Sequence, residues 1–318
     1  MVRIPFETEQ FPVGTVANGS AELSLDWDDI LWAAVTVGRP NRHYVFRHGD
    51  ASAYEAVFRW SITRMALEQS GPAGRRLRRT AAAKTLDPTE KGAVSYFLGM
   101  TFCKLFAAKK LDTPWLLHLD VFRPMLNVVL ASRSRPDLVG EQNGTGQWHA
   151  FECKGRVSTP DSTVKGKAKE QAERLVTVNG TPSALHIGSI AYFQNDVLNF
   201  FWRDPAPQKL NPIEVTLPPD AWRYYYSPIV ELIHGLDRKW PFDAGQNVFV
   251  PVEGLDINVS IHPRVGKHLI EQDWNAARRS ATEGRKELVE AGYQPDGLMI
   301  KAGDSWRKPF QEFPASGR

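Results

Sequence analysis

The sequence has 318 residues, of which 42% are hydrophobic and 24% charged, as in globular chains and unlike disordered or collagen-like ones. The formal net charge of +3 is too small to indicate a polyanionic partner without local clustering. Two cysteines, Cys103 and Cys153, exclude a disulfide framework and a four-thiolate zinc site. The N-terminus lacks a signal-peptide pattern, and the apolar runs are shorter than the ~20 residues that a membrane span needs. We therefore expect a soluble cytoplasmic protein without a membrane partner.

The first part of the chain predicts an irregular or β-rich segment followed by one helix. Leu23–Trp32 is acidic and aromatic, and Asp50 is typical of an N-cap for a helix over Ala51–Gln69. Gly71–Pro72 should end that helix. A basic linker, Arg75–Arg79, is expected to follow.

A second helix has strong start signals. Asp87 is the expected N-cap, Pro88 suits the first helical position, and Glu90 stands three residues after the cap, as in a capping box. The apolar positions repeat with the helical period to about Lys110. Because its other faces also carry apolar residues, this helix should be central and mostly buried.

The block that follows predicts mainly strands. We expect strands over Trp115–Phe122, Pro136–Glu141, Trp148–Gly155, Ala184–Phe193 and Val197–Arg203, and a helix over Val164–Val178. Asn143 and Gly144 favour an antiparallel hairpin between the second and third strands. Beyond Asp204 we expect helices over Ala221–Leu236 and Lys267–Gly292 and strands over Val248–Val252 and Leu255–Ile261, with no chemical motif. The predicted organisation is an N-terminal extension (1–84), a core (85–205) and a C-terminal α+β extension (206–318).

The predicted hairpin carries the residues that could perform chemistry. Glu152 and Lys154 are two apart on one strand, so they should share a face, while Cys153 points to the other side. Asp137 opens the paired strand. Two carboxylates and a backbone carbonyl suit Mg²⁺, with Mn²⁺ as an alternative, and the lysine could handle the attacking water. The expected metal ligands are Asp137, Glu152 and the Cys153 backbone carbonyl.

These residues resemble the motif of the PD-(D/E)XK nuclease superfamily, in Pro136–Asp137 followed by Glu152, Cys153 and Lys154. The resemblance covers about Asp87–Arg203. It implies an α/β restriction endonuclease-like fold, a mixed β-sheet flanked by helices, with N- and C-terminal α+β extensions. It also implies metal-dependent cleavage of phosphodiester bonds.

The spacing alone is weak support for this resemblance. Pro219 and Asp220, followed by Asp237 and Lys239, fit the same pattern. That second copy ends a helical stretch in a polar turn, so its side chains would not share a strand face. The apolar hairpin around the first copy carries the argument.

Two further residues gain a catalytic role from the resemblance, since the superfamily often places an acid on the helix before the sheet and a polar residue on the helix after it. Glu90 fits the first position, with the capping box as its alternative role. Gln171 fits the second, beside Lys154, with an ordinary half-buried glutamine as the alternative.

Basic residues flank the motif. Those expected to contact nucleic-acid phosphates are Arg75, Arg76, Arg78, Arg79, Arg156, Lys165 and Lys169. Solvated loop and helix faces are the alternative for each. Arg135 could contact either a phosphate or a local acid.

Three functions fit these observations. The first is a magnesium-dependent nuclease acting on DNA, in bacterial restriction or phage defence by resemblance. The second is a catalytically silent protein of the same fold that binds nucleic acid or scaffolds a complex. The third is an α/β protein in which Glu152 and Lys154 form only an ion pair. Partner proteins and a homo-oligomer stay open.

Overall fold

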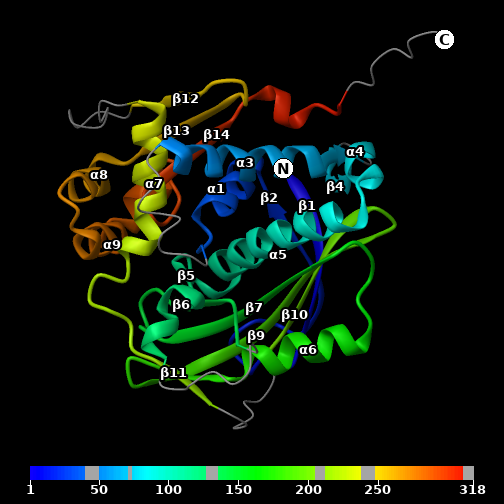
Figure 1. Ribbon diagram of the computed structural model, residues 1–318, viewed down its shortest axis with the longest axis horizontal. Helices are drawn as coiled ribbons and strands as arrows, with labels where there is room; N and C mark the ends of the chain where they lie inside the picture. Colours follow the sequence, from blue (N-terminus) through cyan, green and yellow to red (C-terminus); the bar gives the residue numbers. More distant parts are fainter. Residues whose placement is uncertain (40–49, 71–73, 127–134, 205–211, 238–247, 311–318) are drawn as a thin grey trace.

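The computed structural model describes residues 1–39, 50–70, 74–126, 135–204, 212–237 and 248–310 (Figure 1). Its main sheet joins the N-terminal segment to the central block, with strands in the order β2 (Gly19–Leu25), β1 (Val2–Glu9), β10 (Val197–Arg203), β9 (Thr181–Gln194), β7 (Trp148–Arg156), β6 (Leu138–Glu141) and β5 (Leu116–His118). At its margins β3 (Leu67–Ser70) pairs with β4 (Arg76–Arg79), β4 with β10, and β8 (Leu175–Val178) with β9 and β11 (Ile213–Val215).

The centre of this sheet has a mixed topology. Strands β5, β6 and β7 are antiparallel in sequence order, whereas β7 and β9 are parallel. A parallel pair needs a crossover connection, and helix α6 (Ser162–Ala172) forms part of it. The central block is therefore a helix, three antiparallel strands, a crossover helix and a parallel strand, within an α/β architecture.

Helices cover both faces of this sheet, as Figure 1 shows for α5 (Pro88–Leu111) and α6. On the α5 side, a Cβ added to Gly99 would lie 2.7 Å from the Lys154 carbonyl carbon. On the α6 side, a Cβ added to Gly188 of β9 would lie 3.0 Å from the Lys169 nitrogen. Glycines at these positions therefore allow each helix to approach the strands closely.

The remaining elements surround α5 and the sheet. They are α1 (Trp27–Thr36), α3 (Asp50–Ala66), α4 (Ala81–Thr85), η2 (Leu119–Met125), α7 (Arg223–Leu236), β12 (Val250–Val252), β13 (Ile257–Ile261), α8 (Pro263–Ile270), α9 (Trp274–Glu283), α10 (Arg285–Glu290), β14 (Leu298–Ala302) and η3 (Asp304–Arg307). Strands β12, β13 and β14 form a second, antiparallel sheet. None of the described helices is long and apolar enough to cross a bilayer.

A buried polar network connects α5 to the C-terminal part. The fully buried Lys104 donates from Nζ to the Tyr225 hydroxyl at 2.8 Å. That hydroxyl donates to Asp296 at 2.7 Å, and the Trp32 indole donates to the same carboxylate at 2.8 Å. Because the partners come from α5, α7, α1 and the segment before β14, these elements share one core.

Several local predictions are confirmed. Asp87 caps α5, Pro88 is its first residue, and Glu90 completes the capping box. The hairpin of β6 and β7 is antiparallel, and β10 has the expected bounds.

Other predictions are wrong in their bounds or type, because long-range strand pairing competes with helical periodicity. The helix expected to reach Gln69 ends at Ala66, and β3 follows. Residues 175–178 continue as β8 instead of extending α6. The strand expected to reach Phe122 ends at His118, where η2 begins. The long helix expected over Lys267–Gly292 is three helices, α8, α9 and α10.

The basic segment expected as a linker is also different. Residues 76–79 are strand β4, which pairs with β3 and β10. Strands β1, β2 and β4 and, near the other boundary, β11 join the main sheet, so this sheet crosses both predicted domain boundaries. The domain division itself stays a prediction.

Candidate active site

The start of β6 brings Asp137 to the middle of β7. Leu138 pairs with Phe151, and continuing this register sets Asp137 opposite Glu152. The Leu119 N–H donates to the Asp137 carbonyl at 2.8 Å, and the Cys153 N–H donates to Asp137 Oδ2 at 2.8 Å. Asp137 is therefore held at both its backbone and its carboxylate.

Glu152, Lys154 and Gln171 form a hydrogen-bonded cluster on the α6 side of the sheet. Lys154 Nζ donates to Glu152 Oε1 at 2.6 Å and to Gln171 Oε1 at 2.7 Å. The Glu152 side chain is 3% exposed and that of Lys154 16%. The prediction that Glu152 and Lys154 share a face is confirmed. The structure also brings Gln171 to the lysine, as the resemblance implied.

The two carboxyl groups influence each other's protonation. Burial, and next the charge of Asp137, raise the pKa of Glu152 to about 8, although Lys154 acts to lower it. Burial also raises the pKa of Asp137, against the opposing effects of the Cys153 N–H and of Lys154. Ionising both carboxyls is therefore unfavourable without additional positive charge.

One oxygen of this cluster lacks a hydrogen-bond donor. Glu152 Oε2 is buried and receives no hydrogen bond from an amine, amide or hydroxyl of the described residues, and a hydrogen bond between the Glu152 and Asp137 carboxyls contributes to the raised pKa of Glu152. A buried carboxylate oxygen without a donor costs free energy, and a cation would satisfy it.

The donor set fits a hard cation. Asp137 and Glu152 supply carboxylate oxygens, and the Cys153 backbone, the third expected ligand, is held against Asp137 by its N–H. Within the described ranges, no group of three or more His, Cys, Asp or Glu side chains could hold a metal ion. The magnesium site therefore depends on two side chains and a carbonyl, and it stays a prediction.

Residues that the sequence did not single out lie next to this cluster. Asp120 acts to raise the pKa of Asp137, and both of these aspartates act to raise that of Tyr96. Asp120 pairs with Arg135, so the local acid is the observed partner of that arginine. No spacing rule connects Tyr96 or Asp120 to the motif, because the fold brings them there from α5 and from η2.

Glu90 lies apart from the cluster. It is exposed at the start of α5, and its carboxylate accepts from the Asp87 N–H at 3.1 Å. Helix α5 meets β7 at Gly99, nine residues or ~13 Å further along the helix, and on the opposite side of the sheet from Glu152. The capping role is observed, and the structure does not bring Glu90 to the carboxyl pair.

Several arginines that were predicted to contact phosphates form ion pairs with acidic residues of the same chain. Arg76 pairs with Glu22 at 2.5 Å and Arg79 with Asp196 at 2.7 Å. Because Arg76–Arg79 form strand β4, this segment is not the linker that the sequence predicted.

The lysines of α6 have similar partners. Lys165 lies 3.5 Å from Glu7, and Lys169 lies 3.6 Å from Glu173. Arg156 is exposed and donates to the Gly155 carbonyl. Phosphate binding by any of these residues stays a prediction, and the paired ones would have to exchange partners.

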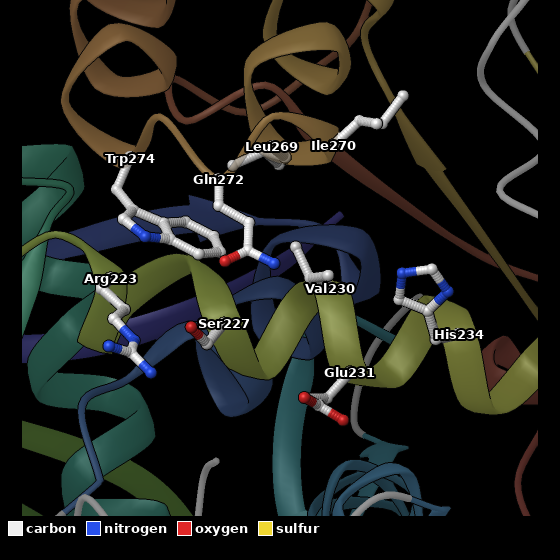
Figure 2. A pocket seen from close by; sticks show the side chains of 9 residues that line it. All are labelled: Arg223, Ser227, Val230, Glu231, His234, Leu269, Ile270, Gln272 and Trp274. Carbon is white, nitrogen blue, oxygen red and sulfur yellow. The ribbon is translucent and has the colours of Figure 1, made fainter.

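The pocket in Figure 2 is a different feature of the molecule. It has a volume of about 280 Å³ and lies between α7 and the α8–α9 connection. Figure 2 shows Arg223 and Trp274 toward one end and His234 toward the other. None of its lining residues belongs to the carboxyl cluster.

No family model, curated protein or solved structure matches this chain.

Proposed function

We propose that the protein is a metal-dependent nuclease that hydrolyses phosphodiester bonds of DNA. The observation that carries this proposal is the cluster of Asp137, Glu152 and Lys154, with two buried carboxyls of raised pKa and a lysine 2.6 Å from one of them. The two carboxyls are buried, and one of their oxygens has no hydrogen-bond donor. This arrangement favours binding of a divalent cation. Asp137, Glu152 and the Cys153 carbonyl would hold it.

Each residue then has a defined task. The metal ion, when bound, would polarise the phosphate and promote ionisation of a bound water. Lys154 would hold the attacking water or stabilise charge that develops on the phosphate, because its ammonium lies beside Glu152. Gln171 would position Lys154 by accepting one of its hydrogen bonds.

The topology around the cluster supports the same proposal. Helix α5, the antiparallel strands β5, β6 and β7, helix α6 and the parallel strand β9 form a mixed sheet flanked by helices, which is the architecture that the resemblance implies. We therefore extend the proposal to this fold. A setting in restriction or phage defence rests on the motif resemblance alone.

The test is cleavage of supercoiled plasmid and of circular single-stranded DNA with Mg²⁺, with Mn²⁺ and with EDTA. Wild type should cut at least one of these DNAs with either metal and neither of them with EDTA, and Lys154→Ala should cut neither. Lys167→Ala is the matched control, because Lys167 is an exposed lysine of the same region on α6. If wild type cuts neither DNA with either metal, a silent nuclease-fold protein becomes the better explanation.

A further inference from the structure

Exposed aromatic rings gather where α3 meets α5. Tyr54 is 73% exposed, Phe58 48% and Tyr96 41%. The Phe58 ring lies 5.4 Å from that of Phe97, and the Tyr96 ring lies 5.5 Å from that of Phe97. Tyr54 precedes Phe58 by four residues, about one helical turn. We call Tyr54, Phe58 and Tyr96 the aromatic patch.

The aromatic patch lies on the α5 side of the sheet, opposite the face that carries Glu152 and Lys154, and it comes within reach of the Asp137 charge at Tyr96. Tyr96 follows Ser95, whose backbone packs directly on Gly155 of β7, immediately after Lys154. The charges of Asp137 and Asp120 also reach the Tyr96 hydroxyl, since they add to the effect of burial in raising its pKa to about 12. A polymer strand that binds at Asp137 would therefore have to continue past the start of β6 to reach these rings on the other face of the sheet.

Positive charge lies beneath the patch. The buried Arg39 and Arg59 share one carboxylate, that of Glu55, which leaves a formal charge of +1. Although burial acts to raise it, the pKa of Glu55 is lowered by both arginines, so the carboxylate stays ionised. The Arg59 guanidinium lies 5.3 Å from the Phe97 ring. Exposed rings above a net positive charge are complementary to a chain of bases and phosphates.

We propose that the aromatic patch stacks the bases of unpaired DNA, so that the protein binds and cuts single-stranded rather than duplex DNA. In a duplex the bases stack on one another and cannot reach the rings, whereas an unpaired strand presents them. This inference rests on the proposed nuclease function and names its substrate.

Binding in EDTA, where metal-dependent cleavage cannot occur, tests the stacking. The probes are a labelled oligothymidylate, the same strand with abasic central nucleotides, and a duplex of equal length. The double variant Phe58→Leu/Tyr96→Leu keeps apolar volume and removes two rings. We expect it to bind the oligothymidylate at least 10-fold more weakly than wild type, since each stacked base contributes about 5- to 150-fold.

The abasic strand separates stacking from charge. Wild type and the double variant should bind it equally, because it keeps phosphates and lacks bases. Tyr96→Phe should bind as wild type. Ile270→Ala is the control for losing an exposed apolar side chain, since Ile270 is 45% exposed on α8. The inference would be overturned if the double variant lost equal affinity for the oligothymidylate and the abasic strand, or if it bound the oligothymidylate as tightly as wild type. Tighter binding of the duplex than of the oligothymidylate by wild type would also overturn it.

Cleavage with Mg²⁺ distinguishes this inference from the proposed function. If wild type cuts duplex and single strand equally fast, and the double variant does the same, the substrate inference fails and the nuclease proposal stands. If wild type cuts no DNA, the nuclease proposal fails, and the substrate inference fails with it even where the rings bind a strand.

Discussion

At the scale of single residues, the position of Lys154 determines what the cluster can do. Its ammonium is held by Glu152 Oε1 and Gln171 Oε1, so it has two acceptors from two elements and a fixed direction. Glu152 retains a second oxygen without a hydrogen-bond donor. Lys154 thus occupies one oxygen of Glu152 and leaves the other beside the Asp137 carboxyl, where a cation could bind both.

The first prediction separates the lysine from a metal ligand. Lys154→Ala should lower the cleavage rate by about 10²–10⁴, because one positioned charge or proton-transfer group is lost. Asp137→Asn should be similarly inactive, while it keeps an oxygen for the Cys153 N–H. Excess Mg²⁺ should partly restore Asp137→Asn and leave Lys154→Ala inactive, measured as single-turnover rates over a metal titration. Equal rescue of both variants would contradict these roles.

The second prediction concerns the positioning of the lysine. Gln171→Met removes one acceptor of Lys154 while keeping side-chain length, and kcat should fall about 10- to 100-fold with KM nearly unchanged. Glu170→Gln, on the exposed face of the same helix, is the control. An equal loss in both variants, or a loss in KM alone, would show that Gln171 does not position the lysine.

At the scale of elements, the approach of α5 to β7 holds the site in place. A Cβ on Gly99 would meet the backbone of Lys154 and Gly155 at 2.7–2.8 Å, and a backbone cannot move as a flexible side chain does. One on Gly92 of the same helix would meet nothing within 4 Å. The close approach of α5 to β7 therefore requires a glycine at position 99, whereas position 92 has room for a side chain.

The third prediction follows from this difference. Gly99→Ala should lower the free energy of unfolding by about 1–3 kcal/mol through overpacking, and it should also slow cleavage by displacing Lys154. Gly92→Ala should raise the free energy of unfolding by about 0.5–1 kcal/mol, because alanine restricts the unfolded chain and suits a helix. Urea unfolding of the two variants measures both values. If both substitutions changed the free energy of unfolding in the same direction, α5 would not contact β7 at Gly99.

At the scale of the whole molecule, the core contains a buried charge-bearing group, Lys104. Its Nζ donates to the Pro114 carbonyl and to the Tyr225 hydroxyl, which in turn donates to Asp296, and it lies 4.5 Å from the centroid of the Trp32 ring. Burial lowers the pKa of Lys104 from 10.5 to about 7, although Asp296 acts to raise it. Folding therefore opposes the charged lysine, at the position where α1, α5 and α7 meet.

The fourth prediction is the pH dependence of stability. Between pH 7 and pH 10.5 the unfolded chain binds more protons at this lysine than the folded chain, so its contribution to the free energy of unfolding rises with pH. Lys104→Met should lack this rise, and the wild-type value minus the variant value should increase from pH 6 to pH 9. Lys110→Met, at an exposed position of the same helix, should track wild type. If the free energy of unfolding had the same pH dependence in wild type and in Lys104→Met, the lowered pKa of Lys104 would be refuted.

Local interactions explain what the sequence predicted well. The capping box at Asp87 and Glu90 depends on residues three apart, and the shared face of Glu152 and Lys154 follows from strand alternation. The β6–β7 hairpin depends on a short loop. Each of these features is encoded within about 20 residues, so no knowledge of the rest of the chain was needed.

Features that depend on distant segments could not be predicted in the same way. Leu175 continues the apolar period of α6, whereas the next three residues of Leu175–Val178 are β-branched and pair with β9 and β11 as strand β8. Glu90 and Gln171 were equal candidates on their helices, and the sides of the sheet on which α5 and α6 pack separate them. The sequence by itself determined the motif, its hairpin and the start of α5, because caps, turns and side-chain alternation act over short distances. Only the tertiary structure decided that Gln171 rather than Glu90 joins the cluster, that Tyr96 comes within reach of the Asp137 charge and that β1 pairs with β10, because long-range burial selects among segments that are locally equivalent.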